Sequence, residues 1–125
     1  MMVYLVEDSL LVRERLRDRI VEIDPDIRVF EADSAEKAVP DILDRCPDIV
    51  VLDLKLAGKS GLNVLLEVKK QEPQVNVTVF SNHSEALYRK KCLSMGANHF
   101  FDKTTDFDKV IDVIKSCMEK EEGDR

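Results

Sequence analysis

The sequence predicts an α/β fold, a doubly wound five-stranded parallel sheet with five helices on its two faces. Short apolar runs alternate with segments of helical periodicity five times along the 125 residues. That alternation is typical of parallel strands joined by right-handed helical crossovers. Residues 49–52 are continuously apolar, which indicates a strand buried on both faces of a covered sheet.

The first strand and helix are predicted from an apolar run followed by an N-cap serine. Residues 3–6 form the run, and Ser9 is a good N-cap for the helix after it. The apolar face of this helix recurs at spacings of four, eight and eleven: Val12, Leu16, Ile20 and Ile23. The Asp-Pro-Asp sequence at 24–26 ends the helix.

The second strand–helix pair repeats this pattern with one conflict. Residues 27–31 are the strand, and Ser34 is the N-cap of a helix that reaches about Cys46. Pro40 lies inside this helix, where it removes a hydrogen bond. We therefore expect Pro40 to kink or shorten the helix.

The third strand runs into Asp53 and is followed by a turn-rich loop at 57–61. The next helix carries apolar residues at Leu62, Leu65 and Leu66. Residues 75–80 are the fourth strand, and a helix over about 84–95 closes at Gly96, a natural residue for a helix C-terminus.

The chain closes with a fifth strand at 99–102 and the helix of clearest periodicity. The apolar positions of this helix are Phe107, Val110, Ile111, Ile114 and Met118. Residues 119–125 are highly charged, and we expect them to be frayed. The predicted organisation is one domain over residues 1–120 followed by a charged tail at 121–125.

Polar side chains stand where the predicted strands end. Glu7 and Asp8 follow the first strand, Asp53 follows the third, and Ser81 and Lys103 follow the fourth and fifth. The carboxyl ends of parallel strands share one edge of the sheet, and ligands bind at that edge. We therefore expect these side chains to lie close together in space.

This set of side chains has a definite chemistry. Three neighbouring carboxylates repel one another, which raises their pKa values, and a divalent cation relieves the repulsion. Oxygen ligands suit Mg²⁺, which commonly bridges to a phosphate. An ammonium and a hydroxyl beside Asp53 indicate a site for a phosphoryl group on that residue, because carboxylates can form aspartyl-phosphates.

With these residues the chain resembles the response-regulator receiver domains (CheY-like) of bacterial two-component signalling, over essentially its whole length. The matching segments are Glu7-Asp8, Asp53 in Val-Val-Leu-Asp-Leu, Gly58-x-Ser60-Gly61, Ser81, and Phe100-Phe101-Asp102-Lys103. The resemblance implies a flavodoxin-like strand order of 2-1-3-4-5. It also implies Mg²⁺-dependent transfer of a phosphoryl group to Asp53 from a histidine kinase or phosphotransfer protein.

The resemblance assigns roles in metal binding and in the rates. Asp8 and Asp53 would ligate Mg²⁺ together with the backbone carbonyl of Lys55, and Glu7 would act through water. Lys55 and His83 would flank the path of attack and tune the rates of phosphorylation and hydrolysis. The protein would be a phosphoacceptor that assists its own phosphotransfer and dephosphorylation, not an enzyme.

The resemblance also implies a switch. Ser81 would contact the phosphoryl oxygens and Lys103 would pair with the phosphate. Movement of Ser81 would vacate space for the Phe100 ring to turn from exposed to buried. The fourth helix, fifth strand and fifth helix would then signal to a downstream target, whose identity the sequence leaves open, and could form a homodimer.

Three positions depart from the common pattern of the family. Lys103 is followed by Thr104 where a proline with a cis bond is usual, so the sequence leaves a cis or a trans bond open. Ala57 replaces a frequent proline and loosens the loop. Phe100 lacks the hydroxyl of a tyrosine, so it cannot report through a phenolic hydrogen bond.

Other functions fit the residues less well. A haloacid-dehalogenase-like phosphatase needs a second aspartate two positions after the first, where this chain has Lys55. A receiver-like module that is not phosphorylated would be expected to have lost part of the acidic set. Binding of flavin is disfavoured because Glu7 and Asp8 would repel its phosphate. The sequence leaves open a stand-alone regulator or the receiver half of a two-domain DNA-binding regulator.

Composition limits the partners and the cellular location that we expect for the protein. A net charge of −6 argues against direct nucleic-acid binding by this domain. No apolar run approaches a membrane span, and the acidic N-terminal segment is unlike a signal peptide. Cys46, Cys92 and Cys117 have no paired spacing and are interpreted as reduced thiols. We therefore expect a cytoplasmic protein with no membrane partner.

Overall fold

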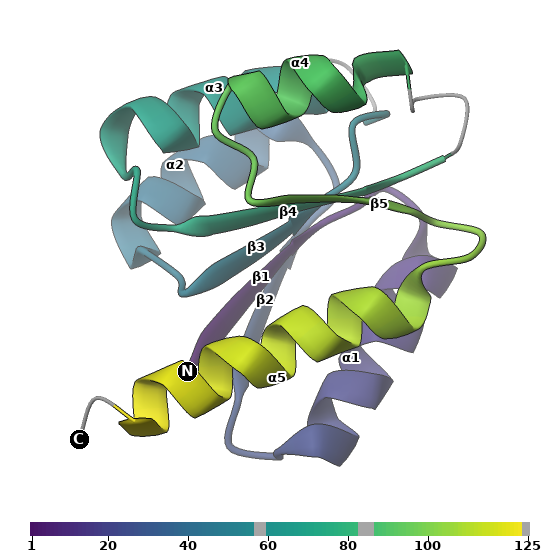
Figure 1. Ribbon diagram of the computed structural model, residues 1–125, viewed down its shortest axis with the longest axis vertical. Coiled ribbons are helices and arrows are strands. Elements are labelled where there is room, and N and C mark those ends of the chain that lie inside the picture. The colour runs from purple at the N-terminus through teal and green to yellow at the C-terminus, as the bar shows by residue number, and fades with distance from the viewer. Residues whose placement is uncertain (57–59, 83–86, 124–125) are drawn as a thin grey trace.

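The computed structural model describes residues 1–56, 60–82 and 87–123. Of these, residues 121–123 are described by their backbone only. Its centre is a parallel sheet with the strand order β2-β1-β3-β4-β5, as predicted (Figure 1). The strands are β1 (Met2–Val6), β2 (Arg28–Ala32), β3 (Ile49–Leu52), β4 (Asn76–Ser81) and β5 (His99–Asp102). The helices are α1 (Leu10–Ile23), α2 (Ala35–Arg45), α3 (Gly61–Gln71), α4 (Arg89–Ser94) and α5 (Phe107–Gly123).

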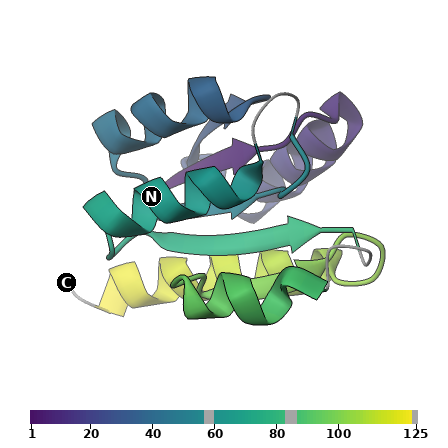
Figure 2. The same ribbon diagram turned by 90° about the horizontal axis from the view of Figure 1, so that it is seen from above.

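The sheet separates two apolar layers. Helices α1 and α5 cover one face, and α2, α3 and α4 cover the other (Figures 1 and 2). Side chains alternate between the faces of a strand, so β3 supplies both layers. Val50 and Leu52 pack with α2 and α3, whereas Ile49 and Val51 pack with α1 and α5. Burial on both faces explains why this strand is an unbroken apolar run.

Two serines cap helices as the sequence predicts. The Ser9 hydroxyl accepts a hydrogen bond from the Val12 backbone N–H at 3.4 Å and begins α1. The Ser34 hydroxyl accepts one from Lys37 N–H, also at 3.4 Å, and begins α2. Each hydroxyl satisfies a backbone donor that has no partner inside the first turn of its helix.

Pro40 does not shorten α2, which continues through it to Arg45. The expected shortening was therefore wrong, and the alternative of a kink at Pro40 stays a prediction. Ala38 and Ile42, on either side of the proline, are fully buried. Most helix stability in a folded protein comes from packing of an apolar face, and here that packing outweighs one missing hydrogen bond.

One of the three apolar residues named for the helix after Asp53 lies outside the buried face of α3. Leu66 is 50% exposed, whereas Val64, Leu65 and Val68 are buried. The buried positions follow the helical repeat from Gly61, which also lies against the sheet. The sequence contains apolar residues on both faces of this helix, and only the packing identifies which face is inside.

The last two helices end at or beyond the positions predicted for them. Residues 84–86, where the fourth helix was expected to begin, lie outside the described residues. The helix closes as predicted at Gly96, which has a φ of +103°. α5 continues to Gly123, so residues 121–123 of the expected tail are helical. In the part of the chain that the structure describes, no helix is both long enough and apolar enough to cross a membrane.

Candidate functional site

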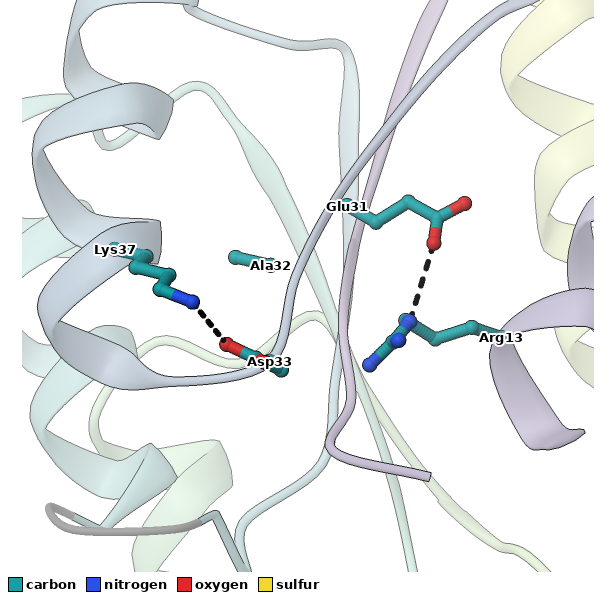
Figure 3. Close-up of a pocket in the computed structure, with 5 residues that line it drawn as sticks. All are labelled: Arg13, Glu31, Ala32, Asp33 and Lys37. Carbon is teal, nitrogen blue, oxygen red and sulfur yellow. Dashed lines mark hydrogen bonds and ion pairs between the residues drawn. The ribbon is translucent and has the colours of Figure 1, made fainter. Parts of the chain in front are cut away.

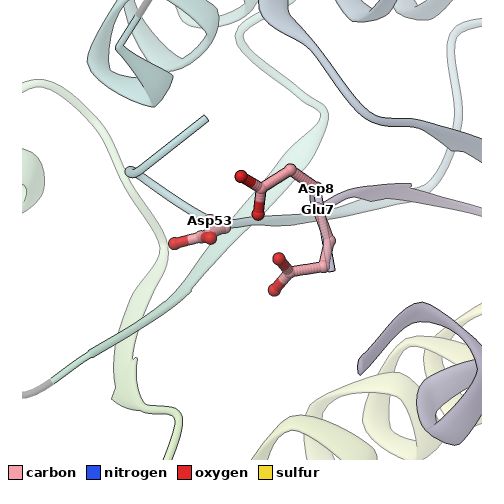
Figure 4. A group of neighbouring side chains, drawn as sticks. All are labelled: Glu7, Asp8 and Asp53. Carbon is pink, nitrogen blue, oxygen red and sulfur yellow. The ribbon is translucent and has the colours of Figure 1, made fainter. Parts of the chain in front are cut away.

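The ends of the first and third strands bring three carboxylates together. Val6 pairs with Leu52, and the Asp53 N–H continues this ladder by donating to the Val6 carbonyl at 2.9 Å. The residues that follow each strand are therefore neighbours. Glu7, Asp8 and Asp53 each offer an oxygen within 4.8 Å of the others (Figure 4). The predicted convergence of these three residues is confirmed.

Asp53 lies at the centre of the site and is 3% exposed. Its Oδ1 accepts hydrogen bonds from the Ser81 hydroxyl at 3.1 Å and from the Lys55 backbone N–H at 3.2 Å. Its Oδ2 accepts one from Lys103 Nζ at 2.9 Å. All four strand ends named in the prediction thus contribute to one group, because Glu7 reaches it through Lys103.

Lys103 is the cation of the site. Its ammonium is 2.5 Å from Glu7 Oε1 and 2.9 Å from Asp53 Oδ2. Its backbone N–H donates to the Ser81 carbonyl at 2.8 Å, which extends the pairing of β4 and β5. Burial disfavours the charged ammonium, but hydrogen bonds to Glu7 and Asp53 outweigh burial and raise the pKa of Lys103.

Glu7 is the buried acid beside that cation, and its side chain is 4% exposed. Burial is the main cause that raises the pKa of Glu7 to about 7, and the charge of Asp53 adds to it. Hydrogen bonds from Lys103 and from the Ser9 N–H act in the opposite direction. The sequence argument expected repulsion between carboxylates to be the cause, but desolvation contributes more.

The donor set fits a hard divalent cation. Asp8 is exposed to solvent, whereas Glu7 and Asp53 are buried beside it. When all are ionised, three carboxylates and the single Lys103 ammonium leave two net negative charges at the site. Oxygen ligands with an open, solvated side are what Mg²⁺ requires, since it retains several waters. The residues present therefore fit Mg²⁺.

The backbone of Lys55 contacts Asp53 directly. The structure gives Lys55 a contact that the sequence did not suggest, the N–H donated to Asp53. The role of its carbonyl as a metal ligand stays a prediction. His83, predicted to tune the rates, lies outside the described residues, as do Ala57 and Gly58.

The aromatic residue of the predicted switch is already buried. Phe100 is 4% exposed and packs in the layer under α2, α3 and α4, so the expected exposed starting position is wrong for this structure. The alternation of β5 sends Phe100 to this layer and Phe101 to the opposite one. Arg89 Nη1 donates to the Phe100 carbonyl at 2.9 Å, and its guanidinium lies 5.9 Å from the ring centre.

The loop after β5 resolves the alternative that the sequence left open. The Lys103–Thr104 peptide bond is trans. Thr104 donates to Asp102 Oδ1 through its N–H at 2.8 Å and through its hydroxyl at 2.7 Å. These bonds order the loop locally without the proline that is usual at this position.

Sequence reasoning missed two residues that support the site. The Gly61 N–H donates to the Leu54 carbonyl at 2.8 Å, and a Cβ at Gly61 would lie 2.3 Å from the Asp53 carbonyl oxygen. Arg13 Nη1 donates to the Glu7 carbonyl at 2.6 Å. Gly61 belongs to the Gly58-x-Ser60-Gly61 motif, but the motif did not show that Gly61 lies too close to Asp53 for a larger residue. No signal in the sequence indicated a role for Arg13.

Known proteins resemble the chain in sequence and in structure. The family model described as "Response regulator receiver domain" matches residues 3–115. The transcriptional activator protein ExaE of Pseudomonas putida is 30% identical over 93% of this chain and 54% of its own length. The transcriptional regulatory protein DegU of Brevibacillus brevis is 26% identical over 90% of this chain and 48% of its own.

A solved structure supports the same assignment. The crystal structure of the receiver domain of NtrX from Brucella abortus has a TM-score of 0.81 and 29% identity. The match covers 94% of this chain and 98% of that domain. By contrast, the chain spans about half the length of the curated relatives ExaE and DegU. The likeness is therefore to one domain of those longer proteins.

Proposed function

The chain belongs to the response regulator receiver domain family of two-component systems, and from that premise we propose that it is a phosphorylation-dependent signalling switch. Asp53 accepts a phosphoryl group from a histidine kinase or a phosphotransfer protein. The observation that carries this proposal is the environment of the Asp53 carboxylate. A hydroxyl, a backbone N–H and an ammonium all donate to it, and two further carboxylates lie beside it.

The transfer forms one bond and breaks one. An Asp53 carboxylate oxygen forms a bond to phosphorus as the bond from phosphorus to the histidine nitrogen of the donor breaks. The nitrogen keeps the electron pair, and a proton from solvent neutralises it. Because such transition states involve little covalent chemistry by the protein, positioning and charge stabilisation are what the site must supply.

The residues around Asp53 divide that work. The Ser81 hydroxyl and the Lys55 N–H, which now donate to Asp53 Oδ1, would donate to phosphoryl oxygens once Asp53 is phosphorylated. Lys103 supplies a fixed positive charge on the opposite oxygen. Asp8, Asp53, the Lys55 carbonyl and, through water, Glu7 would hold Mg²⁺, which when bound neutralises charge on the phosphoryl oxygens.

The signal is carried by packing around the phosphorylated residue. Ser81 is hydrogen-bonded to Asp53, and β4 pairs with β5 beside it, so a shift of Ser81 reaches Phe100 through neighbouring strands. The proposed readout surface comprises α4, β5 and α5. Leu93 in α4 is 41% exposed and Leu87, two residues before α4, is 91% exposed, which supports a contact with a downstream target or with a second copy of the chain.

Membership of the family supports proposals for the domain bounds, the location and the output of this switch. We propose a phosphoacceptor domain over residues 1–120, acting in the cytoplasm and assisting its own phosphotransfer and dephosphorylation without a substrate of its own. Of the two arrangements left open by the sequence, the names of ExaE and DegU support a receiver attached to a transcriptional output. The mass of the native protein distinguishes that arrangement from a stand-alone regulator.

Acetyl phosphate tests the assignment of Asp53. We expect the wild-type chain to gain one phosphoryl group in the presence of Mg²⁺ and to lose the ability when EDTA is added, as measured by intact-mass spectrometry. Asp53→Asn should abolish the gain. Asp33→Asn is the matched control, because Asp33 is an exposed acid at the end of β2 that is paired with Lys37 at 3.1 Å. Equal incorporation by the Asp53→Asn variant would refute the proposal.

Beryllofluoride tests the switch separately. As a phosphoryl mimic it should bind only with Mg²⁺ and should shift the amide resonances of Ser81 and Phe100. Analytical ultracentrifugation of the same sample reports whether the α4–β5–α5 surface forms a homodimer. If beryllofluoride binds without any change at Phe100, the proposal that Asp53 is the phosphoacceptor stands and the proposal that Phe100 is a switch is wrong.

A further inference from the structure

We infer that Arg13 is a positioning residue for the acidic pair Glu7–Asp8, acting from outside the carboxylate cluster through the Glu7 carbonyl. The inference rests on the proposed function, since it concerns the Mg²⁺ site of that function. Arg13 lies in the first turns of α1 and its side chain is 15% exposed. Its hydrogen bonds go to Glu31 and to the Glu7 carbonyl and not to Asp53, so its effect on the reaction would be indirect.

The backbone of Glu7 is held on both sides of its Cα atom. Its N–H donates to the Ala32 carbonyl at 3.1 Å, and its carbonyl accepts from Arg13 Nη1 at 2.6 Å. The Glu7 carbonyl belongs to the peptide plane that leads to Asp8. Because that plane is rigid, fixing its oxygen limits the directions in which the Asp8 side chain can leave the backbone. Asp8 is the exposed carboxylate of the cluster and has the greatest need of such support.

Arg13 is itself anchored at a second point. Its Nε donates to Glu31 Oε1 at 3.1 Å, across one side of a pocket of about 190 Å³ that is also lined by Asp33 and Lys37 (Figure 3). The planar guanidinium directs separate N–H groups at Glu31 and at the Glu7 carbonyl. A lysine has a single ammonium on a flexible stem, so it lacks the fixed fork that serves two partners at once.

The neighbouring Arg17 provides a comparison, because it attaches α1 to β2 without contacting the Glu7 carbonyl. Arg17, one turn later in α1, donates from Nε to Glu31 Oε2 at 2.6 Å. It also donates to the Val29 carbonyl at 3.5 Å, and its hydrogen bonds do not include Glu7. Both arginines therefore attach the helix to the same carboxylate of β2. Only Arg13 extends that attachment to the site.

The experiment compares Arg13→Gln with Arg17→Gln. The readouts are the Mg²⁺ dissociation constant from amide-shift titration, the NMR order parameters of the Glu7 and Asp8 amides without metal, and the urea unfolding midpoint. We expect Arg13→Gln to weaken Mg²⁺ binding roughly tenfold, as for residues that support metal ligands, and to lower the order parameter of Asp8. Arg17→Gln should lose similar stability while both site readouts stay at wild-type values. Arg13→Lys should fall between wild type and Arg13→Gln.

The outcomes separate this inference from the proposed function. If Arg13→Gln keeps the wild-type Mg²⁺ affinity and order parameters, or if Arg17→Gln changes them equally, Arg13 is only a structural attachment and the inference is wrong. A wild-type chain that does not bind Mg²⁺ would contradict the metal-dependent function. The order parameters of Asp8 would still decide whether Arg13 fixes that residue.

Discussion

The Lys103 ammonium donates to Asp53 Oδ2 at 2.9 Å, joining two residues that are 50 positions apart in the sequence. Their side chains are 13% and 3% exposed, so the pair is shielded from water. Lys103 also contacts Glu7 Oε1 at 2.5 Å, and one cation therefore serves two buried carboxylates. Removal of one member of a buried ion pair is costly because the remaining charge is left uncompensated.

Lys103→Met should destabilise the protein by about 3 kcal/mol in the absence of divalent metal, for that reason. Saturating Mg²⁺ should restore part of the loss, since it neutralises the same carboxylates. The chain has no tryptophan, so urea unfolding is followed by far-UV circular dichroism. The control is Lys109→Met, because Lys109 is 64% exposed and its contact with Asp106 is 3.5 Å long. A Lys103→Met loss no larger than the control loss would contradict the prediction.

Gly61→Ala should disturb Asp53 directly. The new Cβ would lie 2.3 Å from the Asp53 carbonyl oxygen and 2.6 Å from the Leu54 Cα atom, so α3 or the end of β3 must move. We expect a loss of about 2 kcal/mol, as for overpacking of a tight site, together with slower phosphorylation by acetyl phosphate. Urea unfolding and intact-mass kinetics measure the two effects.

Gly96→Ala is the control for Gly61→Ala. Gly96 has a φ of +103°, and a Cβ there would meet Lys69 Cγ at 3.3 Å, in a contact that does not involve the residues of the site. This variant should also be destabilised, because alanine rarely adopts that backbone conformation. Its phosphorylation rate under folding conditions should equal that of the wild type. Similar rates for both variants would show that the close approach of Gly61 does not position Asp53.

The sequence was sufficient for the topology and for the carboxylates because both depend on the backbone path. An apolar run fixes where β3 ends, and parallel pairing with β1 then places Asp53 beside Glu7. It was insufficient where two packings satisfy the same pattern. Leu66 fits an apolar stripe of α3 but is exposed. The predicted switch allows Phe100 to be exposed or buried, and in this structure Phe100 is buried.

The supporting contacts of the site could not be predicted for a different reason. The Arg13 contact with the Glu7 carbonyl depends on the approach of α1 to β2, and a backbone carbonyl leaves no trace in the sequence. The same is true of the Lys55 N–H that donates to Asp53. Side-chain chemistry at strand ends is visible in a sequence, whereas the backbone groups that complete it are visible only in the folded chain.

Tyr4→Phe should reveal a pH-dependent contribution to stability far from the site. The buried Tyr4 hydroxyl donates to Asp41 Oδ2 at 2.7 Å, and this bond is the main cause that lowers the pKa of Asp41. A carboxyl whose pKa is lower in the folded state stabilises the protein above its unfolded pKa, and this contribution is lost as the pH falls through the folded value. The variant should lose about 1 kcal/mol at pH 7, because the half-exposed carboxylate is partly solvated.

The pH series completes that prediction. The difference between wild type and Tyr4→Phe should begin to shrink as the pH falls below about 4, the ordinary pKa of an aspartate. It should reach its minimum only once the pH has passed the lowered pKa of Asp41 in the folded wild type. Urea unfolding at several pH values measures it. Tyr88→Phe is the control, because Tyr88 is 43% exposed and its loss should be small at every pH. A difference that does not change with pH would mean that packing, not the hydrogen bond to a carboxylate, accounts for the effect of Tyr4.

Arg89→Gln should loosen the aromatic residue of the proposed switch. Arg89 Nη1 donates to the Phe100 carbonyl at 2.9 Å and the guanidinium lies 5.9 Å from the ring centre, so one exposed side chain joins α4 to β5. The loss of stability should stay below about 1 kcal/mol, as for contacts made by exposed charges. The exchange of the Phe100 ring, measured by aromatic ¹³C relaxation dispersion, should increase, and beryllofluoride should shift it at lower concentration. Lys90→Gln, an exposed neighbour in α4, should leave both measurements unchanged. Equal dispersion in the two variants would remove Arg89 from the switch, because its bond to the carbonyl would then have no influence on the ring.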